Sequence, residues 1–183
     1  MSSTYTTEDQ RLDDAPGLAA GRAGKYLTFD LAGEEYGIEI LKVHEIIGML
    51  PITRVPRTPP FILGVINLRG RVIPTIDLRL KFGLESNEFT RETCIVVVQA
   101  AGTQIGVVVD RVSDVLDIAE DEVEDVPAFG ADVDTSCLIG VAKTGGRVRL
   151  LLDIERVLTT QDVLALHAGR LVGTGAEGAI PPC

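Results

Sequence analysis

Two blocks of this sequence occur twice in the same order, and this internal repeat restricts the fold more than any other feature. In the first block the repeated residues lie 69 positions apart, as for Gly33 and Gly102 and for Gly37 and Gly106. In the second block the spacing is 76 positions, and the repeated pairs are Gly64 and Gly140, Gly70 and Gly146, and Asp77 and Asp153. Repetition of this kind indicates an internal duplication of one small structural unit.

Each copy of the unit has the pattern of short β-strands separated by glycine or proline. Residues 26–31 and 36–40 are extended segments around a turn at Gly33, and residues 95–109 repeat this strand–turn–strand pattern. A unit of this size buries only about 60% of its unfolded surface and is marginally stable alone. We therefore expect a mainly β protein of two small, strongly bent barrels, over residues 25–90 and 91–158, packed around a shared hydrophobic core.

The two ends of the chain have a different pattern. Residues 1–24 are rich in small and polar residues and are typical of a flexible leader, and residues 173–183 are typical of a disordered tail. The segments 153–158 and 161–168 have the spacing of apolar residues that favours helices. The sequence thus predicts a C-terminal helix over residues 159–172, lying on the barrels.

The composition excludes several classes of function. A net charge of −10 opposes binding to nucleic acid or to anionic lipid, and an aromatic content of 4% leaves few side chains for stacking on bases. The three cysteines form no C-x-x-C pair, which favours a reducing compartment over a disulfide framework. We find neither a secretory signal nor an apolar segment long enough to span a bilayer, and we expect a cytoplasmic protein without direct membrane insertion.

Residues that carry enzyme chemistry are sparse. No phosphate-binding glycine motif follows a strand, and neither His44 nor His167 belongs to a metal-ligand pattern. Five carboxylates lie within residues 120–125, but their spacing differs from that of a calcium loop and favours a solvated loop. We expect no catalytic residue, no cofactor and no metal site. The alternative is a small enzyme or ligand-binding barrel that uses the cleft between the barrels.

One segment, residues 52–79, invites a functional interpretation. Its prolines at positions 56, 59 and 60 favour an ordered excursion between strands. Asn67 and Gly70 then frame a turn, and hairpin chemistry explains these two residues as well as a binding role does. Arg69 differs from them, because its counterpart in the second copy is Gly145 and the duplicated fold therefore does not require an arginine there.

Three motifs in this chain are recognisable. They are EYGIEILKVHEI at residues 35–46, PPFILGVINLRG at residues 59–70 (followed by Pro74 and Asp77) and GVVVDRVSDVL at residues 106–116. In this order and spacing they resemble the CheW family of chemotaxis coupling proteins, and the resemblance covers about residues 25–165. It implies two SH3-like five-stranded β-barrels around a common core, in agreement with the duplication. It also implies a non-enzymatic adaptor or scaffold in signal transduction through a two-component system.

By the same resemblance, the partners of the adaptor are the cytoplasmic tip of chemoreceptors and the regulatory domain of a CheA-type histidine kinase. The adaptor would then be recruited from the cytoplasm to membrane-associated receptor arrays. The positions matched to receptor binding are Val43, Glu45, Asn67 and Arg69. Ile38 and Ile40 are the aliphatic residues expected on the kinase side. Within the family, the alternative is an adaptor of a non-chemotaxis array that governs surface motility or a second messenger.

Overall fold

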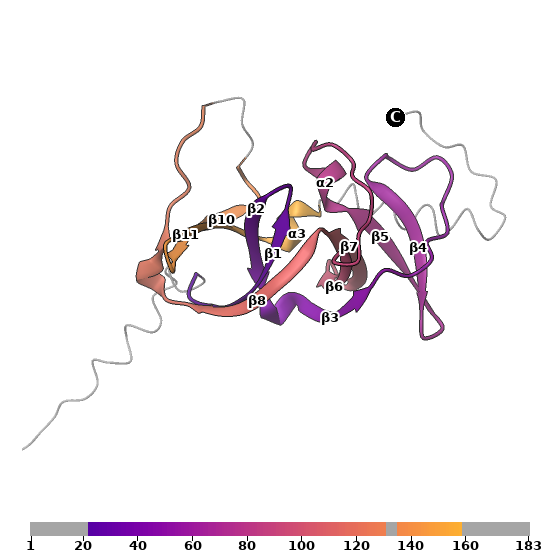
Figure 1. Cartoon of the computed structure of the whole chain (residues 1–183), viewed down its shortest axis with the longest axis horizontal. Helices are drawn as coiled ribbons and strands as arrows, with labels where there is room; N and C mark the ends of the chain where they lie inside the picture. The colour runs from indigo at the N-terminus through magenta and orange to yellow at the C-terminus, as the bar shows by residue number, and fades with distance from the viewer. Residues whose placement is uncertain (1–21, 131–134, 159–183) are drawn as a thin grey trace, which may run out of the picture.

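A computed structural model describes residues 22–130 and 135–158 of the chain, which form two strongly bent β-sheets (Figure 1). Within these residues the six-stranded sheet has the order β8-β1-β2-β11-β10-β9, and the five-stranded sheet has the order β3-β6-β7-β5-β4. The strands of the six-stranded sheet are β1 (Gly24–Leu31), β2 (Glu34–Glu39), β8 (Arg111–Ile118), β9 (Val123–Glu124), β10 (Leu138–Thr144) and β11 (Arg147–Leu152). The strands of the five-stranded sheet are β3 (Val43–Gly48), β4 (Ile62–Leu68), β5 (Arg71–Asp77), β6 (Cys94–Ala100) and β7 (Thr103–Val109). The helical turns are η2 (Ile40–Lys42), α2 (Leu78–Lys81), η3 (Glu120–Glu122) and α3 (Ile154–Val157).

The two sheets repeat one strand order, but each takes strands from both copies of the sequence unit. By the repeat spacing, β1, β2 and β3 correspond to β6, β7 and β8, and β4 and β5 correspond to β10 and β11. The order β8-β1-β2-β11-β10 therefore matches β3-β6-β7-β5-β4 position for position. The first hairpin of each copy joins the later strands of the other copy. Residues 25–90 and 91–158 are thus the two sequence repeats, and neither range forms a sheet by itself.

The connections that follow the first hairpins explain this exchange of strands. Three residues of η2 lead from β2 to β3, and only Asp110 separates β7 from β8. Neither connection contains the two-residue glycine turn that reverses the chain elsewhere in the fold. The chain therefore continues from each first hairpin into the other sheet, where β3 pairs with β6 and β8 pairs with β1.

The predicted turns at the hairpin tips are confirmed. The hairpins β1–β2, β4–β5, β6–β7 and β10–β11 are each closed by two residues with positive φ, as in type I′ turns. Glycine occupies the second position of all four turns. The first position is held by Ala32, Arg69, Ala101 and Gly145, with φ values of 54°, 54°, 50° and 59°. Because this turn type matches the right-handed twist of the strands, it fixes the register of each hairpin.

The shared hydrophobic core predicted from the duplication is confirmed. The largest buried cluster lies between the two sheets and includes Leu27 and Phe29 of β1 together with Val96 and Val98 of β6. A second cluster, which includes Val97, fills the bend of the five-stranded sheet, and a third fills the bend of the six-stranded sheet. Successive residues of β6 face different clusters, so the strand is buried on both faces. This burial explains why β6 is a continuous apolar run instead of an alternating one.

The predicted helical turn near residue 153 is confirmed as α3. Its cap is Asp153, whose carboxylate accepts hydrogen bonds from the backbone N–H groups of Glu155 and Arg156 over 3.0 and 3.4 Å. The helix expected over residues 159–172 and the tail at 173–183 lie outside the described residues, as does the leader up to residue 21. No helix within the described ranges is long and apolar enough to cross a membrane.

The carboxylate run at residues 120–125 lies on the surface at the edge of the six-stranded sheet. Glu122 accepts a hydrogen bond from the backbone N–H of Ala119 over 2.8 Å, and Glu124 pairs with Lys143 over 2.8 Å. The carboxylates lie at the surface as expected, but the run forms the helical turn η3 and the short strand β9 instead of a loop.

Candidate docking face

Arg69 and Glu45 lie on elements at opposite edges of the five-stranded sheet, and the bend of the sheet brings them into contact. Arg69 lies at the tip of the β4–β5 hairpin, and Glu45 lies on β3. The two terminal nitrogens of Arg69 donate hydrogen bonds to Oε1 and Oε2 of Glu45, each over 2.9 Å. This bidentate geometry is the strongest form of an arginine–carboxylate contact. The hydrogen bonds hold the pKa of the Arg69 guanidinium above its usual value.

The backbone at Arg69 adopts a conformation that disfavours arginine. Its φ of 54° lies in the left-handed region, where a Cβ atom crowds the neighbouring carbonyl oxygen. The repeat-related turn has Gly145 at this position, so glycine is compatible with the same geometry. Asn67 closes the Arg69 turn, because its Oδ1 accepts a hydrogen bond from the backbone N–H of Gly70 over 2.9 Å. Arginine is thus held in a strained turn whose other residues already suit the hairpin.

Aliphatic residues on β3 and β8 lie on the side of these strands that faces the core cluster shared by the two sheets, and Glu45 lies on the other side of β3. Val43 and Val112 are related by the repeat, and both are half-buried against the core cluster that the two sheets share. Ile46 and Val115 are likewise related and are 42% and 44% exposed. Figure 1 shows β3 and β8 following one another along the same side of the molecule.

We use the term docking face for the edge of the molecule formed by Val43, Glu45, Ile46, Arg69, Val112 and Val115, in which Glu45 lies on the opposite side of β3 from Val43 and Ile46. It combines exposed aliphatic side chains with one fixed pair of charges. Such a surface suits an amphipathic protein segment, whose apolar side chains can lie against the aliphatics while its polar groups meet the ion pair.

Known proteins share both this sequence and this fold. A family model described as the CheW-like domain matches residues 25–162. The chain belongs to the CheW family. It is 41% identical over 147 residues to the chemotaxis protein CheW of Klebsiella aerogenes, which covers 80% of this chain and 89% of that protein. It is 38% identical over 135 residues to the chemotaxis protein CheW of Bacillus subtilis, with coverages of 73% and 86%.

A solved CheW structure confirms the fold that the resemblance implied. The crystal structure of the scaffolding protein TtCheW from Thermoanaerobacter tengcongensis superposes with a TM-score of 0.69 at 35% identity. The match covers 76% of this chain and 95% of that one. The mainly β, two-barrel SH3-like architecture is therefore shared by this chain and TtCheW.

The residues matched to receptor binding in CheW proteins occupy one part of the surface in this structure. Arg69 contacts Glu45, Val43 lies on the same strand as Glu45, and Asn67 shapes the turn that carries Arg69. Asn67 thus supports the arrangement through the backbone of the turn. Their role in receptor binding stays a prediction.

The two residues expected on the kinase side of this CheW protein differ from one another. Ile38 is 2% exposed and lies in the core cluster between the sheets, so its side chain cannot contact a partner and the expectation for Ile38 is wrong. It pairs with Leu27 of β1, and residues directly opposite on neighbouring strands face the same side of the sheet. Ile40 is half-buried against the same cluster and keeps part of its surface accessible.

Sequence reasoning missed several exposed aliphatic residues in this CheW chain, and Leu41 is the most exposed of them. Leu41 lies in η2 next to Ile40 and is 90% exposed. The repeat spacing places Leu41 opposite Asp110, a charged residue in the other copy. The difference between leucine and aspartate at this repeated position was visible in the sequence, but the exposure of Leu41 was not.

Proposed function

We propose that this chain is a scaffold that couples the cytoplasmic tips of chemoreceptors to a CheA-type histidine kinase in chemotaxis. Membership of the CheW family supports this function, because relatives that cover most of the chain are chemotaxis proteins CheW and a structural relative is a scaffolding protein. The chain acts by binding, with no bond chemistry of its own. It is recruited from the cytoplasm to receptor arrays through these two contacts.

The receptor contact is assigned to the docking face. The observation that carries this assignment is the bidentate ion pair between Arg69 and Glu45, held in a turn that would fold more easily with glycine. Ala32 and Ala101 adopt the same backbone conformation in their turns, so the ion pair with Glu45, and not the backbone alone, is what points to a role for the Arg69 side chain. Val43 and Ile46 provide the neighbouring apolar surface for a helical segment of the receptor tip.

The kinase contact is assigned to η2, where Ile40 and Leu41 lie next to one another. Leu41 is the most exposed large apolar side chain in the described residues. Two contact sites on one chain, η2 and the docking face that begins at Val43, allow the scaffold to join receptor and kinase. Each contact can be modest alone, because an array multiplies weak contacts through effective concentration. Signal transfer then consists of shifting the kinase between states that bind the scaffold with different affinities.

The variant Arg69→Gly tests the receptor contact. Glycine suits φ of 54°, so the variant is expected to fold as well as the unmodified chain while losing the side chain that meets the receptor. Co-sedimentation of the full chain with receptor signalling fragments should show affinity reduced by about tenfold or more. The matched control is Lys143→Ala, which removes an exposed cation that pairs with Glu124 on the other sheet. Equal affinity of Arg69→Gly and the unmodified chain would remove Arg69 from the receptor contact.

The variant Leu41→Ser tests the kinase contact in the same assay. It removes an exposed apolar side chain without opening a cavity, so stability should change little. Binding to the kinase should weaken while binding to the receptor fragments is retained. Loss of receptor binding together with retained kinase binding would reverse the assignment of the two surfaces.

A further inference from the structure

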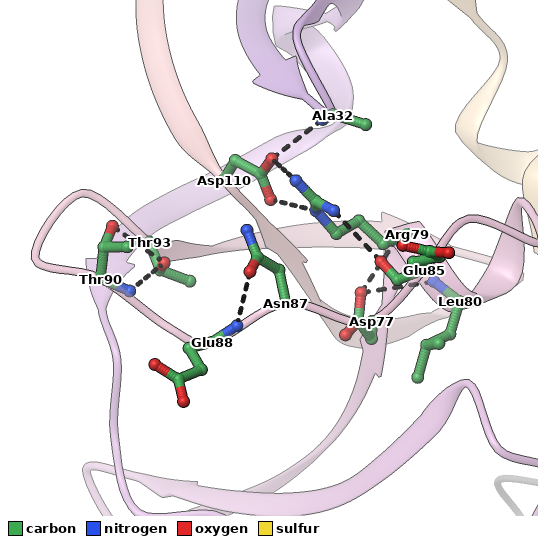
Figure 2. A network of polar contacts seen from close by, with 10 residues as sticks. All are labelled: Ala32, Asp77, Arg79, Leu80, Glu85, Asn87, Glu88, Thr90, Thr93 and Asp110. Carbon is green, nitrogen blue, oxygen red and sulfur yellow. Dashed lines mark hydrogen bonds and ion pairs between the residues drawn. The ribbon is translucent and has the colours of Figure 1, made fainter.

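Arg79 and Asp110 form a second bidentate ion pair, which is partly buried (Figure 2). Nε of Arg79 donates to Oδ1 of Asp110 over 2.8 Å, and a terminal nitrogen donates to Oδ2 over 2.7 Å. The backbone N–H of Ala32 donates to the same Oδ2 over 2.9 Å. The exposed fractions of the Arg79 and Asp110 side chains are 15% and 31%. Limited access of water makes such a pair stronger than one on the open surface.

These three residues come from elements of both sheets. Asp110 is the single residue between β7 of the five-stranded sheet and β8 of the six-stranded sheet. Arg79 lies in α2, which directly follows β5 of the five-stranded sheet. Ala32 lies in the turn between β1 and β2 of the six-stranded sheet. The contact therefore joins one sheet to the other at the point where the chain crosses between them.

Neighbouring contacts fix the position of α2 and of its arginine. The carboxylate of Asp77 caps α2 by accepting hydrogen bonds from the backbone N–H groups of Arg79 and Leu80. The remaining terminal nitrogen of Arg79 donates to the backbone carbonyl of Glu85 over 3.1 Å. Figure 2 shows the guanidinium of Arg79 extended toward Asp110 between these groups. The guanidinium is thus held from both sides.

The repeat supplies a second joint between the sheets, and that joint lacks the contact. The spacing of 69 residues places Leu41 at the position of Asp110, and the spacing of 76 places Glu155 at the position of Arg79. The Leu41 side chain cannot accept a hydrogen bond and is exposed. Glu155 instead makes one side-chain contact of 3.4 Å with Lys42, and the exposed fractions of these side chains are 51% and 36%. Since one of the two related joints folds without the bidentate contact, the duplicated architecture does not require it.

We propose that Arg79 and Asp110 act as a positioning clamp that sets the placement of the two sheets relative to one another. Asp110 directly precedes β8, which carries Val112 and Val115 of the docking face, while β3 of the other sheet carries Glu45. The clamp therefore sets the separation of the two strands that a receptor would contact. This last consequence rests on the proposed function, whereas the effect on sheet placement does not.

The experiment measures the distance between the two sheets in the full chain. Nitroxide labels are attached through Val72→Cys and Val148→Cys, two exposed and repeat-related positions, one on each sheet and neither in contact with the clamp. The three native cysteines are replaced by alanine in this background. Electron–electron dipolar spectroscopy then gives the distribution of distances between the labels. The test variants are Arg79→Ala and Asp110→Asn.

Both test variants are expected to widen or shift the distance distribution. Arg79→Lys keeps the charge but not the bidentate geometry, so its distribution should lie between those of the unmodified chain and Arg79→Ala. The matched control is Glu155→Ala, which changes the position equivalent to Arg79 in the second joint, where the bidentate contact is absent. This control should leave the distribution of distances unchanged. If Arg79→Ala does not fold, Asp110→Asn still decides the question, because asparagine keeps an oxygen for the N–H of Ala32. A distribution that stays unchanged in the folded variants overturns the clamp, as does an equal change in the control.

Receptor binding measured on the same variants separates the two proposals. A changed distribution with weakened receptor binding supports both of them. A changed distribution in a chain whose unmodified form never binds receptor fragments supports the clamp and contradicts the proposed function. Weakened receptor binding with an unchanged distribution contradicts the clamp and leaves the proposed function standing.

Discussion

Gly64→Ala is expected to cost the fold far more than one methyl group normally would. A Cβ atom built at Gly64 would lie 2.0 Å from the carbonyl oxygen of Thr53, so the segment that carries Thr53 must move. This segment is held to β4 by two backbone hydrogen bonds with Val65, of 2.9 and 2.8 Å. Their loss costs about 1 kcal/mol each. The φ of 141° adds a conformational cost of about 1–3 kcal/mol for a residue other than glycine.

The sum predicts that Gly64→Ala lowers the free energy of unfolding by about 3–5 kcal/mol, a large part of the 5–15 kcal/mol typical of a domain. Urea denaturation of the full chain, followed by circular dichroism, measures this value. The matched control is Gly33→Ala, where φ is 86° but nothing lies within 4 Å of the added methyl group. The control isolates the conformational cost and should lose only about 1–2 kcal/mol. Equal losses in the two variants would refute the argument from the contact with Thr53.

Two further predictions concern the region around α2. Arg79 holds the pKa of the Asp110 carboxyl below its usual range, so the stabilisation from this pair is complete above the carboxyl's unfolded pKa and disappears as pH falls through the lowered value. Asp110→Asn should therefore flatten the acid side of a plot of unfolding free energy against pH, and an unaltered acid slope would contradict this. Asp77→Ala removes the cap of α2 and should lower the unfolding free energy by about 1 kcal/mol, whereas Asp77→Asn keeps an accepting oxygen and should lose less. Thermal and urea unfolding of the three proteins measures the difference.

The local features of this fold could be predicted from the sequence because short-range chemistry determines them. Glycine at the second position of each hairpin turn, such as Gly33 and Gly102, fixes the turn type and therefore the strand pairing around it. The caps Asp77 and Asp153 mark equivalent helical turns after β5 and β11. The shared core followed from the size of the repeat, since a unit so small cannot bury enough surface alone.

The exchange of strands between the sheets could not be predicted in the same way. Every strand pair within a hairpin is local, but the pairing of β1 with β8 and of β3 with β6 depends on how two whole repeats pack. The single residue Asp110 between two strands was the signal, because it leaves no room for a reversing turn. The burial of Ile38 could not be predicted from the sequence for a related reason. An apolar residue on an alternating strand faces either core or solvent, and the sheet that packs against Ile38 contains strands of both repeats.

The duplication offers an internal comparison that a single copy of the unit would lack. Where the two copies share a backbone geometry but differ in the residue, the fold itself cannot be the reason for that residue. Arg69 meets this condition, because Gly145 occupies the same turn conformation in the other copy. At the position of Asp110 the other copy has Leu41, although Leu41 lies in the helical turn η2 and Asp110 forms a one-residue connection between strands. The two departures act on the two strands of the docking face, since Arg69 binds Glu45 on β3 and Asp110 directly precedes β8. Two identical copies of the unit would present two equivalent surfaces. Arg69 and Asp110 make the surface that carries the docking face different from its repeat-related counterpart. A scaffold needs such a difference in order to hold its partners in one orientation.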